Sequence, residues 1–447
     1  MKKNLNTFWA SLIVEELIRN GIEYFCISPG SRSTPLVVAV ARNKNARSIV
    51  CYDERSCAFH AVGYARATNK PAVVITTSGT AAANLYPAVT EASNDKVPLV
   101  ILTADRPPEL IDTGANQTID QPKMFGAYTR WQFDLPCPDE SIAPEMVLTT
   151  VDQAIYRSRY NNAGPVHINC RYRKPLEPDD VSPSDEYLKN IVKWKTNSEP
   201  FSVYPESAVS VSNETLDSLV GIIDSSERVM VVVGKLNTDG ERQATLGLIK
   251  KLNCPVYADL TSGLRLGECD TNLIRYYDLE LMSAEFNELA KPSVVIHLGG
   301  KTTSKRVGQF FDLNRPEDYV VIKNSPQRYD PVHAVTMQIE ADVCEVCRAL
   351  CDLVKAKSAG EYAKFFDRKA EQATRVIAEN IDNEKRMSEP FIAREVSKSL
   401  PEGASLFVSN SMPIRDVDLY GAGARANINI AANRGVSGID GIISSAA

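Results

Sequence analysis

The sequence alternates short apolar runs with stretches in which apolar residues recur every three or four positions. Short apolar runs are typical of buried strands, and the recurring spacing is typical of amphipathic helices. The strands predicted in the first part of the chain are 24–27, 49–52, 71–76, 97–103 and 164–170. The helices predicted between them are 7–20, 54–68 and 81–92, with another that begins at Thr34. This order predicts a mostly parallel, doubly wound α/β sheet.

The same alternation returns after a segment rich in Pro, Ser, Asp and Glu, which is predicted to be a surface linker. The strands predicted beyond it are 228–233, 254–258, 293–298, 319–322 and 336–339. A charged helical stretch then leads to a last region with a helix at 391–399 and strands at 405–409 and 427–430. This region is too short for a doubly wound domain, so we expect the third domain to be incomplete.

Composition and charge limit the classes of protein to which this sequence can belong. The 447 residues are 44% hydrophobic and 24% charged, as in ordinary globular proteins. The net charge of -6 gives no indication of a nucleic-acid partner. No run approaches the ~20 apolar residues that span a membrane, and the N-terminal run continues into charged residues without a cleavage site. A cytoplasmic protein with free thiols is therefore expected.

Metal and nucleophile motifs are weak. Cys344, Cys347 and Cys351 begin with a C-x-x-C spacing, but they fall on a helical apolar stripe, which favours a buried helix face over a metal site. The four histidines have no ligand spacing, and His167 and His297 lie within predicted strands, where satisfied core residues are expected. No Walker sequence, G-x-S-x-G elbow or G-x-G-x-x-G turn is present.

Four turns that follow strands of the first domain share small and polar residues, at 28–33, 53–55, 77–80 and 105–108. Such turns gather along one edge of a doubly wound sheet. Glycines and hydroxyls allow a ligand close to the backbone, and helix N-termini offer amides to anions. Arg32 and Arg106 add planar donors that match carboxylates. The alternative for each arginine is a solvated surface position.

Basic residues recur at later turns. Lys305 and Arg306 follow the segment 299–304, and Arg415 and Arg434 follow predicted strands of the last region. A basic surface loop is the alternative for Lys305 and Arg306. Because the chain as a whole is acidic, positive residues at candidate site turns favour small, multiply anionic substrates.

Glu54 stands where a predicted buried strand meets a helix. Asp53 and Glu54 could simply cap that helix with favourable charge. The alternative is a functional carboxylate at the ligand-binding edge of the sheet.

Seven segments carry a resemblance to a known family: SPGSRSTP at 28–35, DER at 53–55, TSGT at 77–80, LTADRPPELID at 102–112, NQ at 116–117, NSMPIR at 410–415 and NRGVSGIDG at 433–441. They resemble the 2-succinyl-5-enolpyruvyl-6-hydroxy-3-cyclohexene-1-carboxylate synthases of menaquinone biosynthesis, a family of thiamine-diphosphate-dependent transferases. The resemblance spans essentially the whole chain.

The resemblance implies three domains of the thiamine-diphosphate enzyme type. They are a pyrimidine-binding domain at 1–180, a linker at 181–208, a central domain at 209–356, a helical connector at 357–388 and the N-terminal fragment of a diphosphate-binding domain at 389–447. The family builds its site between two subunits, which implies a homodimer or a homotetramer.

The implied reaction is decarboxylation of 2-oxoglutarate, followed by 1,4-addition of the resulting carbanion to isochorismate. Both substrates are dicarboxylates, which suits the many basic residues. One alternative is another thiamine-diphosphate carboligase of the acetolactate-synthase type, although a small aliphatic acceptor would not need so many arginines. A non-catalytic binding protein of the same fold is the other alternative.

The resemblance also implies roles for particular residues. Glu54 matches the glutamate that hydrogen-bonds the pyrimidine ring of the cofactor, and Ile439 matches the apolar wedge that holds the cofactor bent. A carboxylate that shares a proton is best served by burial, so we expect a largely buried Glu54 without a cationic partner. The other residues implied to bind the cofactor are Pro29, Ser78, Gly79 and Ser411. Those implied to bind substrate are Ser31, Arg32, Arg106, Gln117, Lys305, Arg306, Ser411, Arg415 and Arg434. The Mg²⁺ ligands are expected beyond residue 447, so these 447 residues alone are expected to be inactive.

Overall fold

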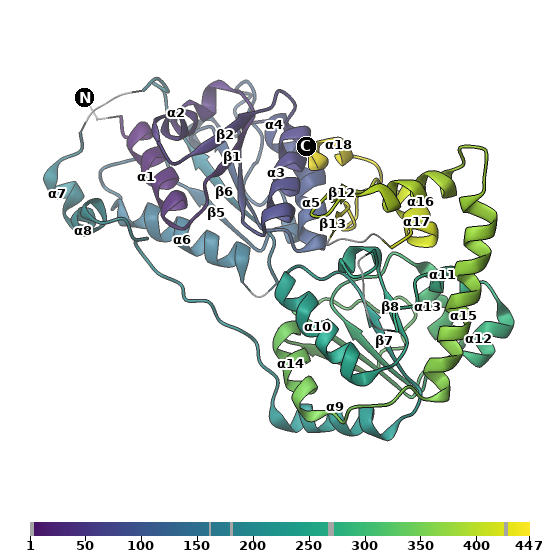
Figure 1. Cartoon of the computed structure of the whole chain (residues 1–447). Coiled ribbons are helices and arrows are strands. Elements are labelled where there is room, and N and C mark those ends of the chain that lie inside the picture. The colour runs from purple at the N-terminus through teal and green to yellow at the C-terminus, as the bar shows by residue number, and fades with distance from the viewer. Residues whose placement is uncertain (1–3, 161, 179–181, 267–271, 424–427) are drawn as a thin grey trace. The chain divides into compact units, whose positions relative to one another are not determined.

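The computed structural model describes residues 4–160, 162–178, 182–266, 272–423 and 428–447 (Figure 1). The chain forms two compact units: Met1–Ser207 together with Asn433–Ala447, and Ala208–Ala432. Each unit contains a parallel β-sheet flanked by helices. The predicted α/β class with consecutive doubly wound sheets is therefore confirmed, whereas the three-domain boundaries stay a prediction.

The first unit contains a six-stranded sheet in the order β2-β1-β3-β4-β6-β5, with every neighbouring pair parallel. Its strands are β1 (Tyr24–Ile27), β2 (Arg47–Val50), β3 (Ala72–Thr76), β4 (Leu99–Asp105), β5 (Trp131–Leu135) and β6 (Pro165–Arg171). β3 and β4 are buried at every residue because they lie inside the sheet with helices on both faces.

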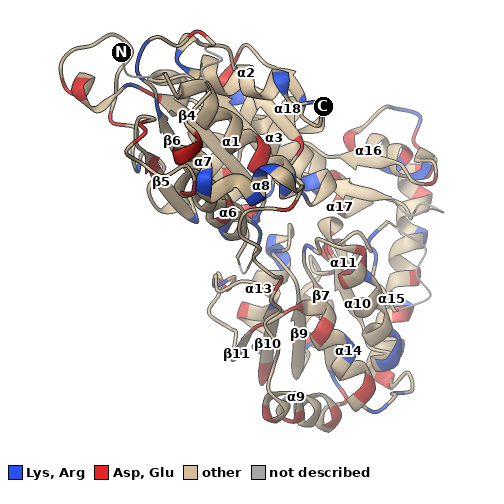
Figure 2. Cartoon of the chain, turned by 90° about the vertical axis from the view of Figure 1, so that its left-hand side faces the viewer, with Lys and Arg blue, Asp and Glu red and all other residues tan. Residues whose placement is uncertain are grey.

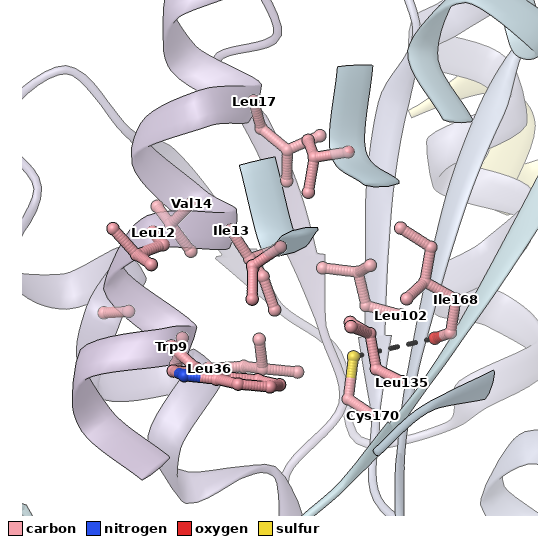
Figure 3. Close-up of a cluster of buried hydrophobic side chains, with 14 of the residues drawn as sticks. Trp9, Leu12, Ile13, Val14, Leu17, Leu36, Leu102, Leu135, Ile168 and Cys170 are labelled. Atoms are coloured by element: carbon pink, nitrogen blue, oxygen red, sulfur yellow. Dashed lines mark hydrogen bonds between the residues drawn. The ribbon is translucent and has the colours of Figure 1, made fainter. Parts of the chain in front are cut away.

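Two apolar layers hold this sheet. One face is covered by α1 (Asn6–Arg19), α2 (Thr34–Arg42) and α6 (Glu145–Arg159). In this layer Trp9 and Leu36 pack with Leu102 and Leu135 of the sheet (Figure 3). The other face is covered by α3 (Glu54–Thr68) and by α5 (Tyr86–Asp95), which follows the short α4 (Thr80–Ala83).

The predicted linker is folded in part. It contains α7 (Asp185–Leu188) and α8 (Val192–Thr196). Trp194 is buried, its indole Nε1 donates to Glu16 Oε2 at 2.5 Å, and the Arg19 guanidinium lies 3.9 Å from its ring centroid. One tryptophan and few other apolar residues thus dock a polar segment that has no clear periodicity in the sequence.

The second unit contains a five-stranded parallel sheet in the order β11-β10-β9-β7-β8. Its strands are β7 (Val229–Val233), β8 (Val256–Ala258), β9 (Val294–Leu298), β10 (Asp318–Lys323) and β11 (Met337–Glu340), as predicted. One apolar layer involves α9 (Asn213–Ser225), α10 (Asp239–Leu252) and α14 (Val343–Leu353). The opposite layer involves α11 (Tyr277–Glu280), α12 (Ala284–Leu289), α13 (Lys305–Leu313) and α15 (Glu361–Ile377).

The remaining elements form a small cluster and a terminal helix. β12 (Ser405–Phe407) and β13 (Asn429–Ala431) pair in parallel, and α16 (Glu389–Ser399) and α17 (Met412–Tyr420) share an apolar cluster with them. α15 continues as a π-helix over Ala378–Asp382. α18 (Ile442–Ala446) belongs to the first unit, where Ser445 Oγ donates to the Phe59 carbonyl oxygen of α3 at 3.1 Å.

Several predictions of elements need correction. The predicted helix 81–92 is two helices, because the chain turns before Pro87, which suits the first turn of α5. The predicted strand 49–52 is β2, an edge strand whose residues are mostly exposed rather than buried. β5 and α6 were not predicted at all.

Three cysteines and two histidines lie in the elements predicted for them. Cys344, Cys347 and Cys351 lie on α14, and Cys347 is fully buried. Across the described ranges no group of three or more His, Cys, Asp or Glu residues could hold a metal ion. His167 and His297 are buried, and each has a hydrogen-bond partner, Thr103 and Tyr319 respectively.

Candidate active site

The four predicted turns lie side by side in the first unit. They follow β2, β1, β3 and β4, which are consecutive neighbours in a parallel sheet, so their carboxyl ends share one edge. A Cβ atom added at Gly30 would stand 2.3 Å from Thr77 Cβ. The turn after β1 therefore touches the turn after β3, and this contact requires glycine at position 30.

The turn after β3 is locked to the segment that carries Gln117. Ser78 Oγ donates to the Gln117 carbonyl oxygen and Gln117 Nε2 donates to the Ser78 carbonyl oxygen, both at 3.0 Å. The Gly79 amide donates to Gln121 Oε1 at 2.9 Å, with Gly79 at φ +81. Ser78 and Gly79 are buried, whereas Gln117 is exposed. Three predicted site residues thus form one rigid group.

Arg32 is buried, so a solvated surface position is the wrong interpretation for it. Only 3% of its surface is exposed, and its Nη1 donates to the Tyr172 carbonyl oxygen at 2.7 Å. Its Nε is buried and has no hydrogen-bond partner within the part of the chain that the structure describes. Burial lowers the pKa of Arg32, and the neighbouring positive charge of Arg106 acts in the same direction.

Arg106 is half-buried at the end of β4. Its Nη2 donates to the Asn116 carbonyl oxygen at 2.9 Å, which ties the turn after β4 to the segment before Gln117. Ser31 and Pro29 are exposed in the turn after β1. The structure therefore brings together the first-unit residues at this edge, with two guanidinium groups among them.

The first unit also contains a buried polar network that was not predicted from the sequence. Asn169 Nδ2 donates to Asp105 Oδ2 at 2.8 Å, and Arg171 Nη1 lies 3.3 Å from the same oxygen. Gln121 Nε2 and Thr103 Oγ1 both donate to Asn169 Oδ1 at 2.9 Å. Burial raises the pKa of Asp105. Polar residues at every second position of 103–105 and 167–171 are the signal that could have revealed it.

Glu54 is the first residue of α3 and is half-buried, so the expectation of a largely buried side chain is wrong for this chain. β2 is the outermost strand, and Val50 and Tyr52 beside Glu54 are 59% and 93% exposed. Asn84 Nδ2 donates to Glu54 Oε2 at 3.3 Å. Among the described residues Glu54 has no ion pair.

The cap of α3 is Asp53, whose Oδ1 accepts from the Ser56 amide at 2.8 Å. Hydrogen bonds from the helix N-terminus lower the pKa of Asp53. The capping alternative is therefore correct for Asp53 and leaves the Glu54 carboxylate available for another partner.

Arg434 and Ile439 also belong to the first unit, in the segment that packs on α3 and α5. Arg434 is half-buried and has no hydrogen bond or ion pair with any described residue. Ile439 is 74% exposed. Both side chains are thus available to a ligand.

The remaining predicted residues belong to the second unit. Lys305, Arg306 and Arg415 line a pocket of about 240 Å³ with Asp278 and Ser304. Arg306 Nη1 and Ser304 Oγ both donate to Asp278. Lys305 and Arg306 form the first turn of α13 and are not a surface loop. Ser411 is exposed at φ 69 directly before α17.

Three basic residues and two acids, Asp278 and Asp418, line this pocket, and Asp418 lies 3.7 Å from Arg265. Arg306 has an acidic partner, whereas Lys305 has no partner among the described residues and Arg415 contacts only Met412 Sδ, at 3.8 Å. Basic and acidic residues are interspersed along the elements of the chain (Figure 2). Two unpaired cations in one hollow favour a carboxylate-bearing ligand.

Comparison with known proteins agrees with the resemblance. Residues 9–124 match a model of the thiamine pyrophosphate enzyme, N-terminal TPP binding domain, and residues 185–408 match the middle domain of thiamine pyrophosphate enzymes. The chain is 43% identical over 442 residues to the 2-succinyl-5-enolpyruvyl-6-hydroxy-3-cyclohexene-1-carboxylate synthase of Rubrobacter xylanophilus, covering 99% of this chain and 76% of that protein. It is 42% identical over 446 residues to the synthase of the same name from Prosthecochloris aestuarii, covering 100% and 75%.

The chain belongs to this synthase family. It is also 38% identical over 474 residues to the chloroplastic protein PHYLLO of Arabidopsis thaliana, covering 99% of this chain and 28% of that protein. The synthase family is one of thiamine-diphosphate enzymes, and the N-terminal match is to a cofactor-binding domain. No helix in the described part of the chain has the length and apolar character needed to cross a membrane.

The residues present fit that cofactor. Glu54 offers a carboxylate free of ionic partners, and the turn with Ser78 and Gly79 lies on the same edge, where Gly30 permits close backbone approach. A carboxylate of this kind can hydrogen-bond a ring nitrogen, and turns of small residues admit a ligand close to the backbone.

Proposed function

We propose that this protein decarboxylates 2-oxoglutarate and adds the remaining acyl unit to isochorismate in a 1,4 fashion, with thiamine diphosphate as cofactor. The products are 2-succinyl-5-enolpyruvyl-6-hydroxy-3-cyclohexene-1-carboxylate and CO2. Membership of the synthase family supports the reaction. The observation that carries it is the pocket of the second unit, in which Lys305 and Arg415 have no acidic partner among the described residues. Arg434 of the first unit also has none.

Glu54 is proposed as the catalytic residue. Thiamine diphosphate, when bound, supplies the electron sink that makes decarboxylation of a 2-oxo acid possible. The Glu54 carboxylate is free of ion pairs and stands at the ligand-binding edge of the sheet. It would hold a proton at the pyrimidine ring of the cofactor and so control the charge of that ring. Pro29, Ser78, Gly79, Ser411 and Ile439 are proposed to hold the same cofactor.

The basic residues are proposed to orient the two dicarboxylate substrates. Arg32 is fixed by burial, and Arg106 is fixed by its bonds to the Asn116 carbonyl oxygen, so both present guanidinium groups with little freedom. A guanidinium group pairs with a carboxylate through two parallel hydrogen bonds, which sets direction as well as affinity. The other residues proposed to bind substrate are Ser31, Gln117, Lys305, Arg306, Ser411, Arg415 and Arg434.

Further parts of the proposal come from the resemblance alone. They are a homodimer or homotetramer, a cytoplasmic location, and Mg²⁺ as the partner of the diphosphate. An acetolactate-synthase-type activity is the weaker proposal, since a small aliphatic acceptor leaves the unpaired cations without a role.

A product assay by mass spectrometry tests the proposal. The complete gene product is incubated with thiamine diphosphate, Mg²⁺, 2-oxoglutarate and isochorismate. We expect the mass of the 1,4-adduct, which should disappear when either substrate is left out. Equal product formation with pyruvate as donor and acceptor would instead support the acetolactate-type alternative.

A further inference from the structure

Glu91 of α5 holds the turn that follows Arg434. The Glu91 carboxylate is fully buried and accepts three consecutive backbone amides, from Gly435 at 2.9 Å, Val436 at 2.7 Å and Ser437 at 2.8 Å. Arg66 Nη2 of α3 lies 3.2 Å from Glu91 Oε1 and supplies the balancing positive charge. Main-chain amides from 435–437 thus converge on one carboxylate.

Arg66 fixes the start of the same segment. Its Nη1 donates to Asn433 Oδ1 at 2.6 Å, and its Nη2 pairs with Asp95 at 2.8 Å. Asn433 Nδ2 in turn donates to Ser445 Oγ at 3.2 Å, so the end of the segment is connected to its beginning. The segment is therefore held at both ends and in the middle.

The fit around Glu91 is tight. A Cβ atom added at Gly435 would stand 2.4 Å from the Glu91 carbonyl oxygen and 2.8 Å from its Oε2. Only glycine lets the backbone come this close to α5. The buried carboxylate also needs these donors, because an unpaired charge in the interior is costly. The turn and Glu91 therefore depend on each other.

The two predicted site residues of this segment flank the anchored amides. Arg434 directly precedes them and Ile439 follows shortly after. Arg434 has no partner among the described residues, and Ile439 is largely exposed. The backbone beside these two side chains is thus fixed while the side chains themselves are free to meet a ligand.

We propose that Glu91 is a positioning residue that sets, through the amides of 435–437, the direction in which Arg434 and Ile439 face substrate and cofactor. This positioning role rests on the proposed function, because it concerns the substrate of that reaction. Glu91 itself touches neither ligand. It acts on binding by removing the freedom of a turn that would otherwise have to be ordered when the ligands arrive.

Amide hydrogen exchange of the peptide 434–440 tests the anchor without any need for activity. Glu91→Ala removes the acceptor, and we expect exchange at 435–437 to accelerate about tenfold or more, the effect of losing hydrogen bonds to a charged group. Glu91→Gln keeps one acceptor oxygen and should give a smaller acceleration. Asn94→Ala is the matched control on α5, since Asn94 Nδ2 donates to Thr90 of its own helix. Unchanged exchange rates in Glu91→Ala would show that Glu91 does not hold the amides of 435–437.

Steady-state kinetics of the complete gene product then separate positioning from a purely structural role. In Glu91→Gln we expect KM for the substrate held by Arg434 to rise about tenfold, with a smaller change in kcat. Faster exchange with unaltered KM and cofactor affinity would show that the anchor is structural only and overturn the positioning role. Absence of turnover in the unmodified protein would contradict the proposed function instead, because the exchange result stands independently.

Discussion

Glu54 does not cap its helix, because Asp53 accepts the Ser56 amide at the start of α3. Its carboxylate bonds only to Asn84 among the described residues. A carboxylate left without a structural task, at an edge where ligands collect, is a good candidate for chemistry.

Glu54→Gln should therefore lower turnover by at least ~100-fold, the scale of a lost general acid or base. The fold should stay intact, because Asp53 and not Glu54 caps α3. The circular dichroism spectrum of the variant should therefore equal that of the unmodified protein. Glu214→Gln is the matched control, an exposed glutamate in the first turn of α9. Near-normal turnover in Glu54→Gln would remove Glu54 from the proposed role.

The buried acids Glu16 and Asp152 predict how stability depends on pH. Glu16 of α1 is fully buried; burial, together with its hydrogen bond to Asp152 of α6, raises the pKa of Glu16 to about 8. Burial also raises the pKa of Asp152. The amide of Phe201 donates to Glu16 at 2.6 Å and that of Ser202 donates to Asp152 at 2.8 Å. The pair thus fastens the segment after α8 to the first unit.

The sign of the pH effect follows from proton binding. Between the ordinary pKa of 4.5 and about 8, folded Glu16 holds a proton that the unfolded chain releases. The free energy of unfolding should therefore fall as pH rises through this window, by up to ~1.4 kcal/mol per pH unit, and level off above it. Urea unfolding of Glu16→Gln should show a weaker pH dependence. An identical slope in the variant would contradict the assignment to Glu16.

At the scale of elements, the carboxyl edge of the first sheet depends on close contact between turns. The turn after β1 lies against the turn after β3 at Gly30, and the turn after β3 is bonded to the Gln117 segment. Because each of these contacts joins a side chain of one segment closely to the backbone of another, they leave little room for adjustment.

Gly30→Ala should therefore destabilise the first unit by ~1–3 kcal/mol, since the new Cβ meets the non-terminal Thr77 Cβ atom. We also expect weaker binding of thiamine diphosphate, measured by titration calorimetry, because the turns must separate. Gly247→Ala in α10 is the control: no heavy atom lies within 4 Å of its added Cβ, so it should not lower stability. Equal melting temperatures for the two variants would contradict the crowded contact.

At the scale of the whole molecule, the central elements could be predicted and the peripheral ones could not. The bounds of β1 and α3 match the prediction, because apolar runs and capping residues mark them. The strand 49–52 was predicted to be buried, but it is an edge strand. A short apolar run suits a central strand and an edge strand equally well, and only the pairing of the strands distinguishes the two positions. α8 depends on one docked tryptophan, which leaves no periodicity to detect.

For the site, the sequence predicted that the turns share an edge, because this follows from parallel strand order. It could not predict that Arg32 is buried or that Glu91 holds 435–437, since both depend on contacts between residues far apart in the chain. The roles of Lys305, Arg415 and Arg434 came from the family resemblance, to which the structure adds their lack of acidic partners.

The division into two units gives the protein a built-in optical probe. All three tryptophans, Trp9, Trp131 and Trp194, belong to the first unit, and the second unit has tyrosine and phenylalanine but no tryptophan. Selective excitation of indole therefore reports the unfolding of the first unit alone, whereas circular dichroism follows both. If the units unfold independently, the two signals should give separate midpoints in one denaturant titration. Each variant described above could then be assigned to the unit it weakens without labels or truncation.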